Sequence, residues 1–296
     1  MIFGVDKLSL GSDKIGGNRQ TDPPSFGKAK RVPRWWLNLS VYRRRSQAMD
    51  LIQDSKNNND FELGKVSLVI LSCKRLPQLQ RLVASLETFF NTTESYQFIE
   101  KVLVDNGSGP HLVEWATATN FFDLIIAHKK NQGMAVALND AFKKVRGEYI
   151  LLLEEDFVLD SQSPFLERCI GLFNEYPEIG IIRLKDQRNW GKKFRIIGPL
   201  RKTSSGTEFW TWLPSMNGKL NVWTAGSVMF RKVSFSATGQ IPTGPNVDRN
   251  SPNHQGILYE EVYGKKYNRI WLAAKIKDCY PFFQPEDNPE SPGWSE

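Results

Sequence analysis

Cysteine is scarce in this sequence, and the few cysteines lie far apart. The 296 residues include Cys73, Cys169 and Cys279, and no Cys-x-x-Cys pair occurs. Three isolated thiols indicate neither a disulfide framework nor a cysteine-based zinc site. Unpaired cysteines are typical of a reducing compartment, so we expect a cytoplasmic protein.

Long apolar runs are missing as well. No stretch approaches the roughly 20 apolar residues that a membrane-spanning helix needs. The sequence also lacks a charged start followed by an apolar run, so we expect no signal peptide. These absences predict a soluble protein whose only membrane contact would be peripheral.

Most of the chain has almost no net charge. Residues 1–50 contain ten Lys or Arg and four Asp, whereas the remainder contains 29 basic and 28 acidic residues. The near-neutral remainder does not indicate nucleic-acid binding. In the basic part, Trp35 and Trp36 stand among arginines, a pattern that can dock at an anionic membrane surface. The alternative is that both tryptophans pack onto the body of the protein.

A glycine-rich phosphate loop is the last absence. The first predicted strand, at residues 66–72, ends in Ser72 and is followed by Cys-Lys-Arg, which matches neither a Walker nor a dinucleotide-binding fingerprint. Backbone amides and Arg75 at this strand exit could instead meet an anion or a base. A plain surface turn would explain the same residues.

What the sequence has is a run of acids directly after an apolar strand. Residues 148–153 suit a buried parallel strand, and Glu154, Glu155 and Asp156 follow at once. Three adjacent carboxylates at a strand exit repel one another and lose hydration, so they require a cation or hydrogen-bond donors. The carboxyl ends of strands are also where open α/β sheets bind ligands.

A hard divalent metal would compensate these acids. The donors are all oxygens and no Cys–His cluster exists, so we expect Mn²⁺ or Mg²⁺ carrying a phosphorylated ligand. Asp156 would be the metal ligand, and Glu154 or Glu155 would hold metal-bound water or a ribose. A solvated acidic strand end is the alternative.

Strands and helices alternate from residue 64 onward. Strands are predicted at 66–72, 99–104, 124–127, 148–153 and 179–184, and helices at 77–90, 112–119, 133–145 and 165–176. This alternation predicts a mostly parallel sheet with helices on both faces.

We also expect a short helix near 40–53, a linker at 54–60, a strand at 221–231, a helix at 259–275 and a last strand at 279–283. The expected organisation is a basic, partly flexible extension at 1–60, one domain at 61–285 and a tail at 286–296.

Two further strand and loop ends carry polar turns. Asp105 opens Asp-Asn-Gly-Ser and could accept a hydrogen bond from a nucleobase or ribose. Asn131 is a suitable N-cap for the following helix, and Gly133 would let a pyrophosphate approach the positive helix end closely. A plain turn and ordinary capping explain these residues equally well.

A second acid pair, Glu260 and Glu261, follows a Pro-, Gly- and Asn-rich loop at 239–256. A carboxylate near a nucleophilic hydroxyl could act as general base. Alternatively, the pair stabilises a helix dipole. His254 could complete a metal shell, but a single histidine in a polar loop is more often exposed, so we do not assign it as a ligand.

Small residues interrupt an apolar run before residue 231. Gly226 and Ser227 would permit close approach of a sugar, and Trp210, Trp212 and Trp223 could stack on a sugar ring. The alternative is that these tryptophans fill the core.

Taken in order, these pieces resemble the family 2 glycosyltransferases of the GT-A fold over roughly residues 64–285. The matching segments are 66–75, Val104-Asp105-Asn106-Gly107-Ser108, Asn131-Gln132-Gly133 with Ala137 and Asn139, and 146–156. The resemblance implies an α/β fold of GT-A type. Its parts would be a mostly parallel nucleotide-binding sheet flanked by helices, a smaller acceptor-side β region and a C-terminal helix.

The resemblance also implies roles. Ser72, Arg75 and Asp105 would bind the nucleotide, and Asp156 would bind Mn²⁺ or Mg²⁺ on the diphosphate. The Glu260–Glu261 pair would be catalytic, with Glu261 favoured as the base.

The chain departs from the family pattern at its acids. The usual Asp-x-Asp is replaced by Glu154-Glu155-Asp156, and the usual Glu-Asp by Glu260-Glu261. The Gln-x-x-Arg-Trp sequence of processive synthases is absent, which favours a single-transfer enzyme.

The expected activity is therefore metal-dependent, inverting transfer of a sugar from a nucleotide-diphosphate sugar to a hydroxyl of a glycan, lipid-linked or protein acceptor. A retaining mechanism is not excluded by the sequence. A sugar nucleotidyltransferase would share the sheet, the metal and the acids, although it would normally carry a glycine-rich loop. An inactive sugar-nucleotide or glycan-binding module also fits these residues.

Overall fold

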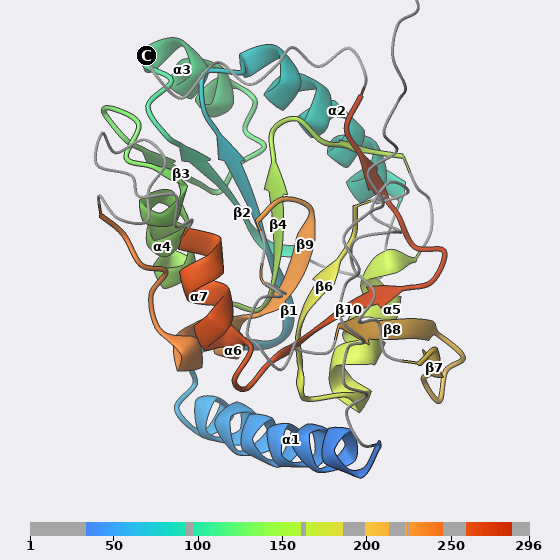
Figure 1. Cartoon of the computed structure of the whole chain (residues 1–296). Coiled ribbons are helices and arrows are strands. Elements are labelled where there is room, and N and C mark those ends of the chain that lie inside the picture. Colours follow the sequence, from blue (N-terminus) through green and yellow to red (C-terminus); the bar gives the residue numbers. More distant parts are fainter. Residues whose placement is uncertain are drawn as a thin grey trace, which may run out of the picture.

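The computed structural model of the chain describes residues 34–92, 98–160, 164–185, 199–212, 223, 225–244 and 259–285. Helices and strands alternate through most of it (Figure 1). In chain order the elements are α1 (Arg34–Asn57), β1 (Glu62–Ser72), α2 (Leu76–Thr92), β2 (Phe98–Asp105), α3 (Pro110–Ala118), β3 (Leu124–Ala127), α4 (Met134–Lys144), β4 (Gly147–Glu154), β5 (Val158–Leu159), α5 (Phe165–Glu175), β6 (Ile179–Arg183), β7 (Arg201–Lys202), β8 (Glu208–Trp212), β9 (Val228–Arg231), α6 (Lys232–Thr238), α7 (Tyr259–Tyr267), β10 (Leu272–Ile276) and β11 (Phe282–Phe283).

Among the described residues, one nine-stranded sheet has the order β3-β2-β1-β4-β9-β6-β10-β8-β7. The four strands from β3 to β4 are parallel to one another. Strand β9 is antiparallel to both of its neighbours, so β6 and its parallel partner β10 run in the same direction as β4. The predicted mostly parallel sheet is confirmed, with β9 inserted antiparallel and with antiparallel pairing of β8 to β10 and of β7 to β8 at one edge.

Helices cover both faces of this sheet, because the strands alternate their side chains between two cores. On β1, Leu68 and Ile70 point into a core formed with α2, α3 and α5. Val69 and Leu71 point the other way, into a core formed with α4, α6 and α7. Both sets of side chains are almost fully buried, as expected for a central parallel strand.

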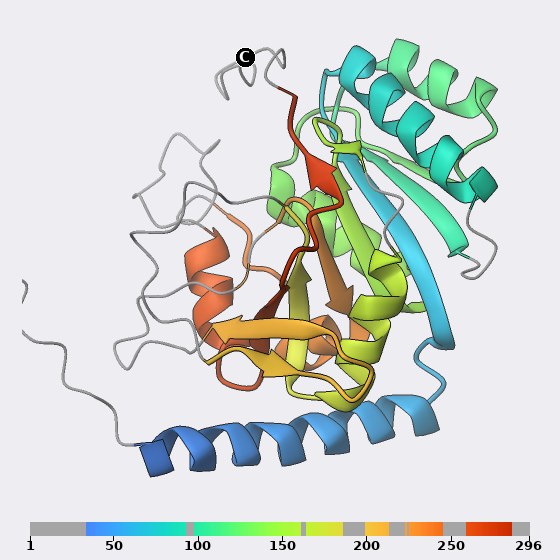
Figure 2. The ribbon, with the colours of Figure 1, turned by 90° about the vertical axis from the view of Figure 1, so that its right-hand side faces the viewer.

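Helix α1 lies across the lower end of the sheet and is longer than the helix expected at 40–53 (Figure 2). Residues 54–57 continue the helix where we expected a linker. Ala48, a residue of this helix, is fully buried. Arg44 donates to the carbonyl of Asn268, and Arg45 donates to the carbonyl of Glu175 at 3.1 Å. Two of the arginines that a membrane contact would use therefore bind the rest of the protein instead. The side chains of Trp35 and Trp36 lie outside the described part of the structure.

One prediction is wrong in the C-terminal part. We expected a single helix at 259–275, but α7 ends at Tyr267 and residues Leu272–Ile276 form β10 in the middle of the sheet. An apolar run buried on all sides has no periodicity that separates helix from strand. Pairing with neighbouring strands determines that this segment is a strand, because Ala273 pairs with both β6 and β8.

The last predicted strands are shorter than expected. Strand β9 begins at Val228 rather than at 221, and most of residues 221–224 lie outside the described part. Strand β11 covers only Phe282–Phe283 of the run expected at 279–283. No helix in the described part of the chain is long and apolar enough to cross a membrane.

Candidate active site at the strand ends

Three neighbouring strands end side by side. The sheet register pairs Ser72 of β1 with Asp105 of β2, and Leu71 of β1 with Glu154 of β4. Two backbone hydrogen bonds continue the pairing past the strands: Asn106 donates to the carbonyl of Ser72 at 2.8 Å, and Glu155 donates to that of Leu71 at 3.1 Å. The residues predicted at separate strand exits therefore share one edge of the sheet.

Ser72 and Asp105 are both buried at this edge. The Ser72 hydroxyl has no hydrogen-bond partner among the described residues. Both carboxylate oxygens of Asp105 accept the backbone N–H of Ser108, at 3.1 and 3.2 Å. Burial raises the pKa of Asp105, while the Ser108 hydrogen bonds and the neighbouring His128 act in the opposite direction. A carboxyl of this kind can accept or donate a hydrogen bond to a polar ligand.

Asn106 organises the loop that precedes α4. Its side-chain NH₂ donates to Oδ1 of Asn131 at 2.9 Å, and its Oδ1 accepts the backbone N–H of Gln132 at 3.0 Å. His128 Nδ1 lies 3.1 Å from the same oxygen, and its Nε2 lies 3.2 Å from Asp140 on α4. One buried amide thus ties the end of β2 to the loop at 128–132.

Asn131 and Gly133 take different positions from those expected. Oδ1 of Asn131 accepts the backbone N–H of Gly133 at 2.8 Å. Gly133 itself, with φ of 84°, is the cap residue of α4, and no side chain caps this helix. The prediction of Asn131 as N-cap is therefore wrong. The positive φ at Gly133 bends the chain before the first helical turn, so the side chain of Asn131 reaches Gly133 and not the helix.

Arg75 connects the exit of β1 to the acids after β4. Its Nε lies 3.7 Å from Oε1 of Glu155, and its Nη1 lies 3.4 Å from Oδ2 of Asp156. Oε1 of Glu155 also lies 3.4 Å from the backbone N–H of Cys73. Glu155 is thus directed inward, to β1. Asp156 Oδ2 additionally accepts the side-chain amide of Gln284 at 2.8 Å.

The glutamates of the trio tolerate negative charge poorly. Burial raises the pKa of Glu154 to about 7, with Asp156 and Glu260 adding to the rise and Lys185 opposing it. Burial also raises the pKa of Glu155 to about 8, although Arg75 favours its charged form. Near neutral pH, a proton or a cation bound at this edge would therefore be stabilised.

The donor chemistry fits a hard divalent cation that is shared with a phosphorylated ligand. Within the described ranges, no group of three or more His, Cys, Asp or Glu side chains is arranged to hold a metal. One or two carboxylates are, however, what Mg²⁺ commonly takes from a protein, with substrate phosphates and water completing its shell. Arg75 contacts both Glu155 and Asp156, but Glu155 is also turned to the backbone N–H of Cys73. Asp156 and Glu154 are therefore the oxygen donors suited to that role. His254 lies outside the described residues.

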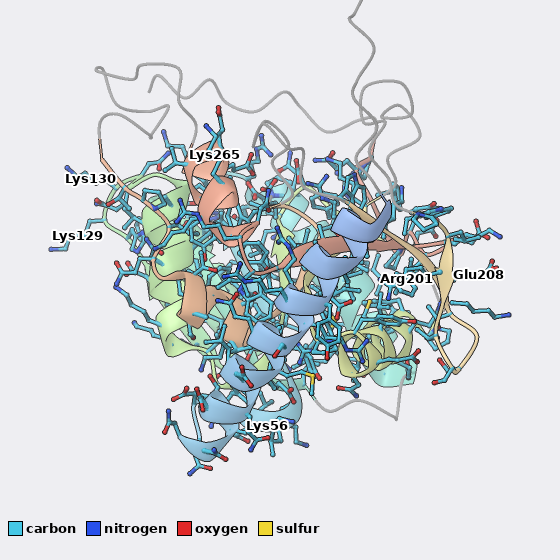
Figure 3. The ribbon with its side chains drawn as sticks, turned by 60° about the horizontal axis from the view of Figure 1, so that its bottom comes forward. Lys56, Lys129, Lys130, Arg201, Glu208 and Lys265 are labelled. Carbon is cyan, nitrogen blue, oxygen red and sulfur yellow. The ribbon has the colours of Figure 1, made fainter. Side chains whose placement is uncertain are left out.

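The two acids of α7 lie in different environments. Oε1 of Glu260 accepts the backbone N–H of Ala225 at 3.1 Å, and Glu260 is close enough to Glu154 to raise its pKa. Glu261 is exposed, and it pairs with Lys265 at 2.8 Å one turn along the helix. Lys265 points outward from α7 (Figure 3). Glu260 is thus the acid of the pair within electrostatic range of Glu154, whereas Glu261 lies on the outer side of the helix.

Sequence reasoning missed the basic and amide side chains near these acids. Arg183, at the end of β6, is buried with its guanidinium 5.0 Å from the ring centre of Trp212. Burial lowers its pKa to about 10, and Glu260 opposes that shift. Lys185 and Gln284 approach the trio from outside the first four strands. No local signal marks any of the three, because their placement depends on the far half of the sheet.

Two of the three tryptophans considered for sugar stacking lie in the core, whereas Trp210 on β8 is half-buried. Trp223 is almost fully buried and packs against Phe230 and Tyr263. Trp212 is also buried, and its ring faces Arg183. For these two, the core-filling role holds.

The matching family model is that of glycosyl transferase family 2, which covers residues 67–238. That is more than half of the chain and includes the three strand ends. A search of curated proteins returned no match.

Solved structures give a similar picture of the fold. S. aureus TarS 1–349 in complex with UDP-GlcNAc has a TM-score of 0.52 and 15% identity, covering 76% of this chain and 60% of that one. S. aureus TarS has a TM-score of 0.51 and 14% identity, covering 74% of this chain and 36% of that one. This chain thus spans about three fifths of the shorter structure. The predicted fold of GT-A type is confirmed.

Proposed function

Because the chain belongs to glycosyl transferase family 2, we propose that it transfers a sugar from a nucleotide-diphosphate sugar to an acceptor hydroxyl. The observation that carries the proposal is the convergence of Ser72, Asp105 and the acid trio at one sheet edge. Ligands of open α/β sheets bind at such an edge. The acceptor would be a glycan, a lipid-linked molecule or a protein.

The nucleotide would bind along β1, β2 and the loop before α4. Asp105 offers hydrogen bonds to a base or ribose, and the buried Ser72 hydroxyl has capacity for one. Arg75 supplies a cation beside the diphosphate position. Asn131 and Gly133, held through Asn106, would shape the wall of this pocket.

Asp156, with Glu154, would hold Mn²⁺ or Mg²⁺. A bound divalent cation compensates the charge that develops on a leaving diphosphate. Glu155 would support this site indirectly, because its pair with Arg75 fixes the exit of β1 beside Asp156.

We assign the general base to Glu260, since it is the acid of the pair that lies toward the trio. The acceptor oxygen would bond to the anomeric carbon as the bond from that carbon to the diphosphate breaks. Glu260 would take the hydroxyl proton, and the nucleoside diphosphate would leave. Attack from the face opposite the leaving group would invert the anomeric centre. Positioning both substrates in one pocket would supply much of the rate.

The test combines binding and turnover. A panel of nucleotide-diphosphate sugars should raise the thermal midpoint of the protein with Mn²⁺, because a ligand at about 100 times its Kd adds roughly 2.7 kcal/mol of stability. Asp156→Ala should lose metal-dependent transfer and donor hydrolysis while staying folded. The exposed Asp50 on α1 provides the control Asp50→Ala.

Two results would reject parts of this assignment. Full metal-dependent activity in Asp156→Ala would remove the metal site from position 156. Donor binding without transfer or hydrolysis, with any acceptor and with Mn²⁺, would instead identify a binding module.

A further inference from the structure

The C-terminal part of the described chain forms one wall of the acid site. Strand β11 pairs with β5, which begins two residues after Asp156, so that Phe282 faces Leu159 and Phe283 faces Val158. The backbone N–H of Asp160 donates to the carbonyl of Pro281 at 2.9 Å. The two-stranded sheet therefore holds residues 281–284 against the segment that follows the trio.

Gln284, directly after β11, bridges Asp156 and Lys185. Its Nε2 lies 2.8 Å from Oδ2 of Asp156, and its Oε1 lies 3.0 Å from Nζ of Lys185. An ammonium group can only donate and an ionised carboxylate can only accept. The amide therefore has one orientation that satisfies both neighbours, with NH₂ toward Asp156 and oxygen toward Lys185.

The lysine end of this bridge is also fixed. Nζ of Lys185 lies 5.4 Å from the ring centre of Phe157, the residue after Asp156. An isolated bridge pairs the backbone of Lys185 with that of Phe282 on β11. Lys185 is thus positioned at both its backbone and its side chain, which limits the amide of Gln284 to a narrow range.

We propose that Gln284 is a positioning residue that orients the carboxylate of Asp156 for a divalent cation. The inference rests on the proposed function, which gives Asp156 its ligand role. Side chains that hydrogen-bond a ligating carboxylate fix its direction before the ion arrives, and their loss typically weakens metal binding about 10- to 100-fold. A carboxylate has about four lone-pair sites on its two oxygens, so the Gln284 amide and the Arg75 contact at Oδ2 together still leave lone pairs for a cation.

The test measures metal affinity directly, without donor or turnover. Free Mn²⁺ is followed by its electron paramagnetic resonance signal during titration with the full chain. Gln284→Ala should raise the Kd for Mn²⁺ by about tenfold or more, from the lower end of the range for such supporting bonds upward. Gln284→Leu keeps the volume but loses both hydrogen-bonding groups, and it should behave like the alanine variant.

Gln53 supplies a matched control. It is an exposed glutamine on α1 whose amide donates to Asn57, four residues along the same helix, at 2.9 Å. Gln53→Ala should leave the Kd for Mn²⁺ unchanged. Thermal unfolding of each variant without metal separates loss of orientation from loss of fold, since the exposed Gln284 side chain should contribute little to stability.

Asp156→Ala separates failure of this inference from failure of the proposed function. If Asp156→Ala weakens Mn²⁺ binding and Gln284→Ala does not, the metal site stands and the positioning role is overturned. Tighter binding by Gln284→Ala also overturns it, because the amide would then compete with the ion. If the unchanged protein binds no Mn²⁺, or Asp156→Ala binds it normally, the ligand role of Asp156 and the positioning role of Gln284 both fail.

Discussion

The side-chain amide of Asn106 donates to Oδ1 of Asn131 at 2.9 Å, which joins the turn after β2 to the loop before α4. The same amide accepts the backbone N–H of Gln132 through its oxygen. Because Asn106 is buried, water does not replace these bonds. The proposed nucleotide pocket therefore depends on a side chain that need not touch the nucleotide.

Asn106→Ala should loosen this loop. It removes the shared partner of the Asn131 side chain and the Gln132 backbone, and the loss of each of these part-buried hydrogen bonds costs about 0.5–1.5 kcal/mol. We expect a lower midpoint in urea unfolding and a higher KM for the donor, with a smaller effect on kcat. Asn57→Ala, at the exposed end of α1, is the control. Unchanged stability and KM would show that the loop holds its shape without Asn106.

Gly107→Ala should lower the free energy of unfolding more than Gly109→Ala does. Both glycines have positive φ, 89° and 97°, so both substitutions carry backbone strain of about 1–3 kcal/mol. A Cβ at Gly107 would come within 2.4 Å of the backbone nitrogen of Asn131, whereas one at Gly109 would meet nothing within 4 Å. The difference in unfolding free energy between the two variants isolates the close approach of the two loops. Equal losses would contradict that approach.

The stability of the metal-free protein should fall as pH rises. Burial raises the pKa of Glu155 from 4.5 to about 8. The folded state therefore holds more protons than the unfolded state between these values, and the stability that depends on the protonated form is lost as pH rises through the folded pKa. Urea unfolding in a chelator at pH 6 and pH 8.5 measures the fall. Glu155→Gln should flatten it, and an unchanged slope would exclude Glu155 as its source.

Glu260→Gln and Glu261→Gln should differ sharply in kcat. Removal of a general base typically lowers kcat by about 10²- to 10⁴-fold, so Glu260→Gln should show that loss with little change in donor affinity. Glu261→Gln loses one exposed pair with Lys265, worth less than about 1 kcal/mol, and should retain most activity. The reverse outcome would assign the base to Glu261.

Much of the first half of the fold was predictable because its signals are local. Apolar runs of strand length separated by helical periodicity gave β1 to β4 with errors of a few residues at their ends. The acids after β4 could be placed at a strand exit because a parallel central strand is apolar throughout and its end is abrupt. The alternation of strands and helices also predicts that Ser72 and Asp105 lie at the same end of the sheet, whereas their direct pairing comes from the strand order of the structure.

The second half was less predictable because its segments are buried on both sides. Residues 268–275 were predicted to continue the helix that ends at Tyr267, but Ala273 lies between two neighbouring strands. The prediction of Asn131 as N-cap was wrong for a different reason, since the backbone turn at Gly133 and the contact with Asn106 compete with capping.

The sequence by itself determined which residue types stand at each strand exit, and therefore the family and the candidate site. Only the tertiary structure decided which of them meet. Packing of Tyr263 and Tyr267 in the core sets the rotation of α7, which turns Glu260 toward the trio and Glu261 outward. The pairing of β11 with β5 brings Gln284 to Asp156 across 128 residues. Helix rotation and long-range strand pairing are set by the burial of distant side chains, which no local pattern contains.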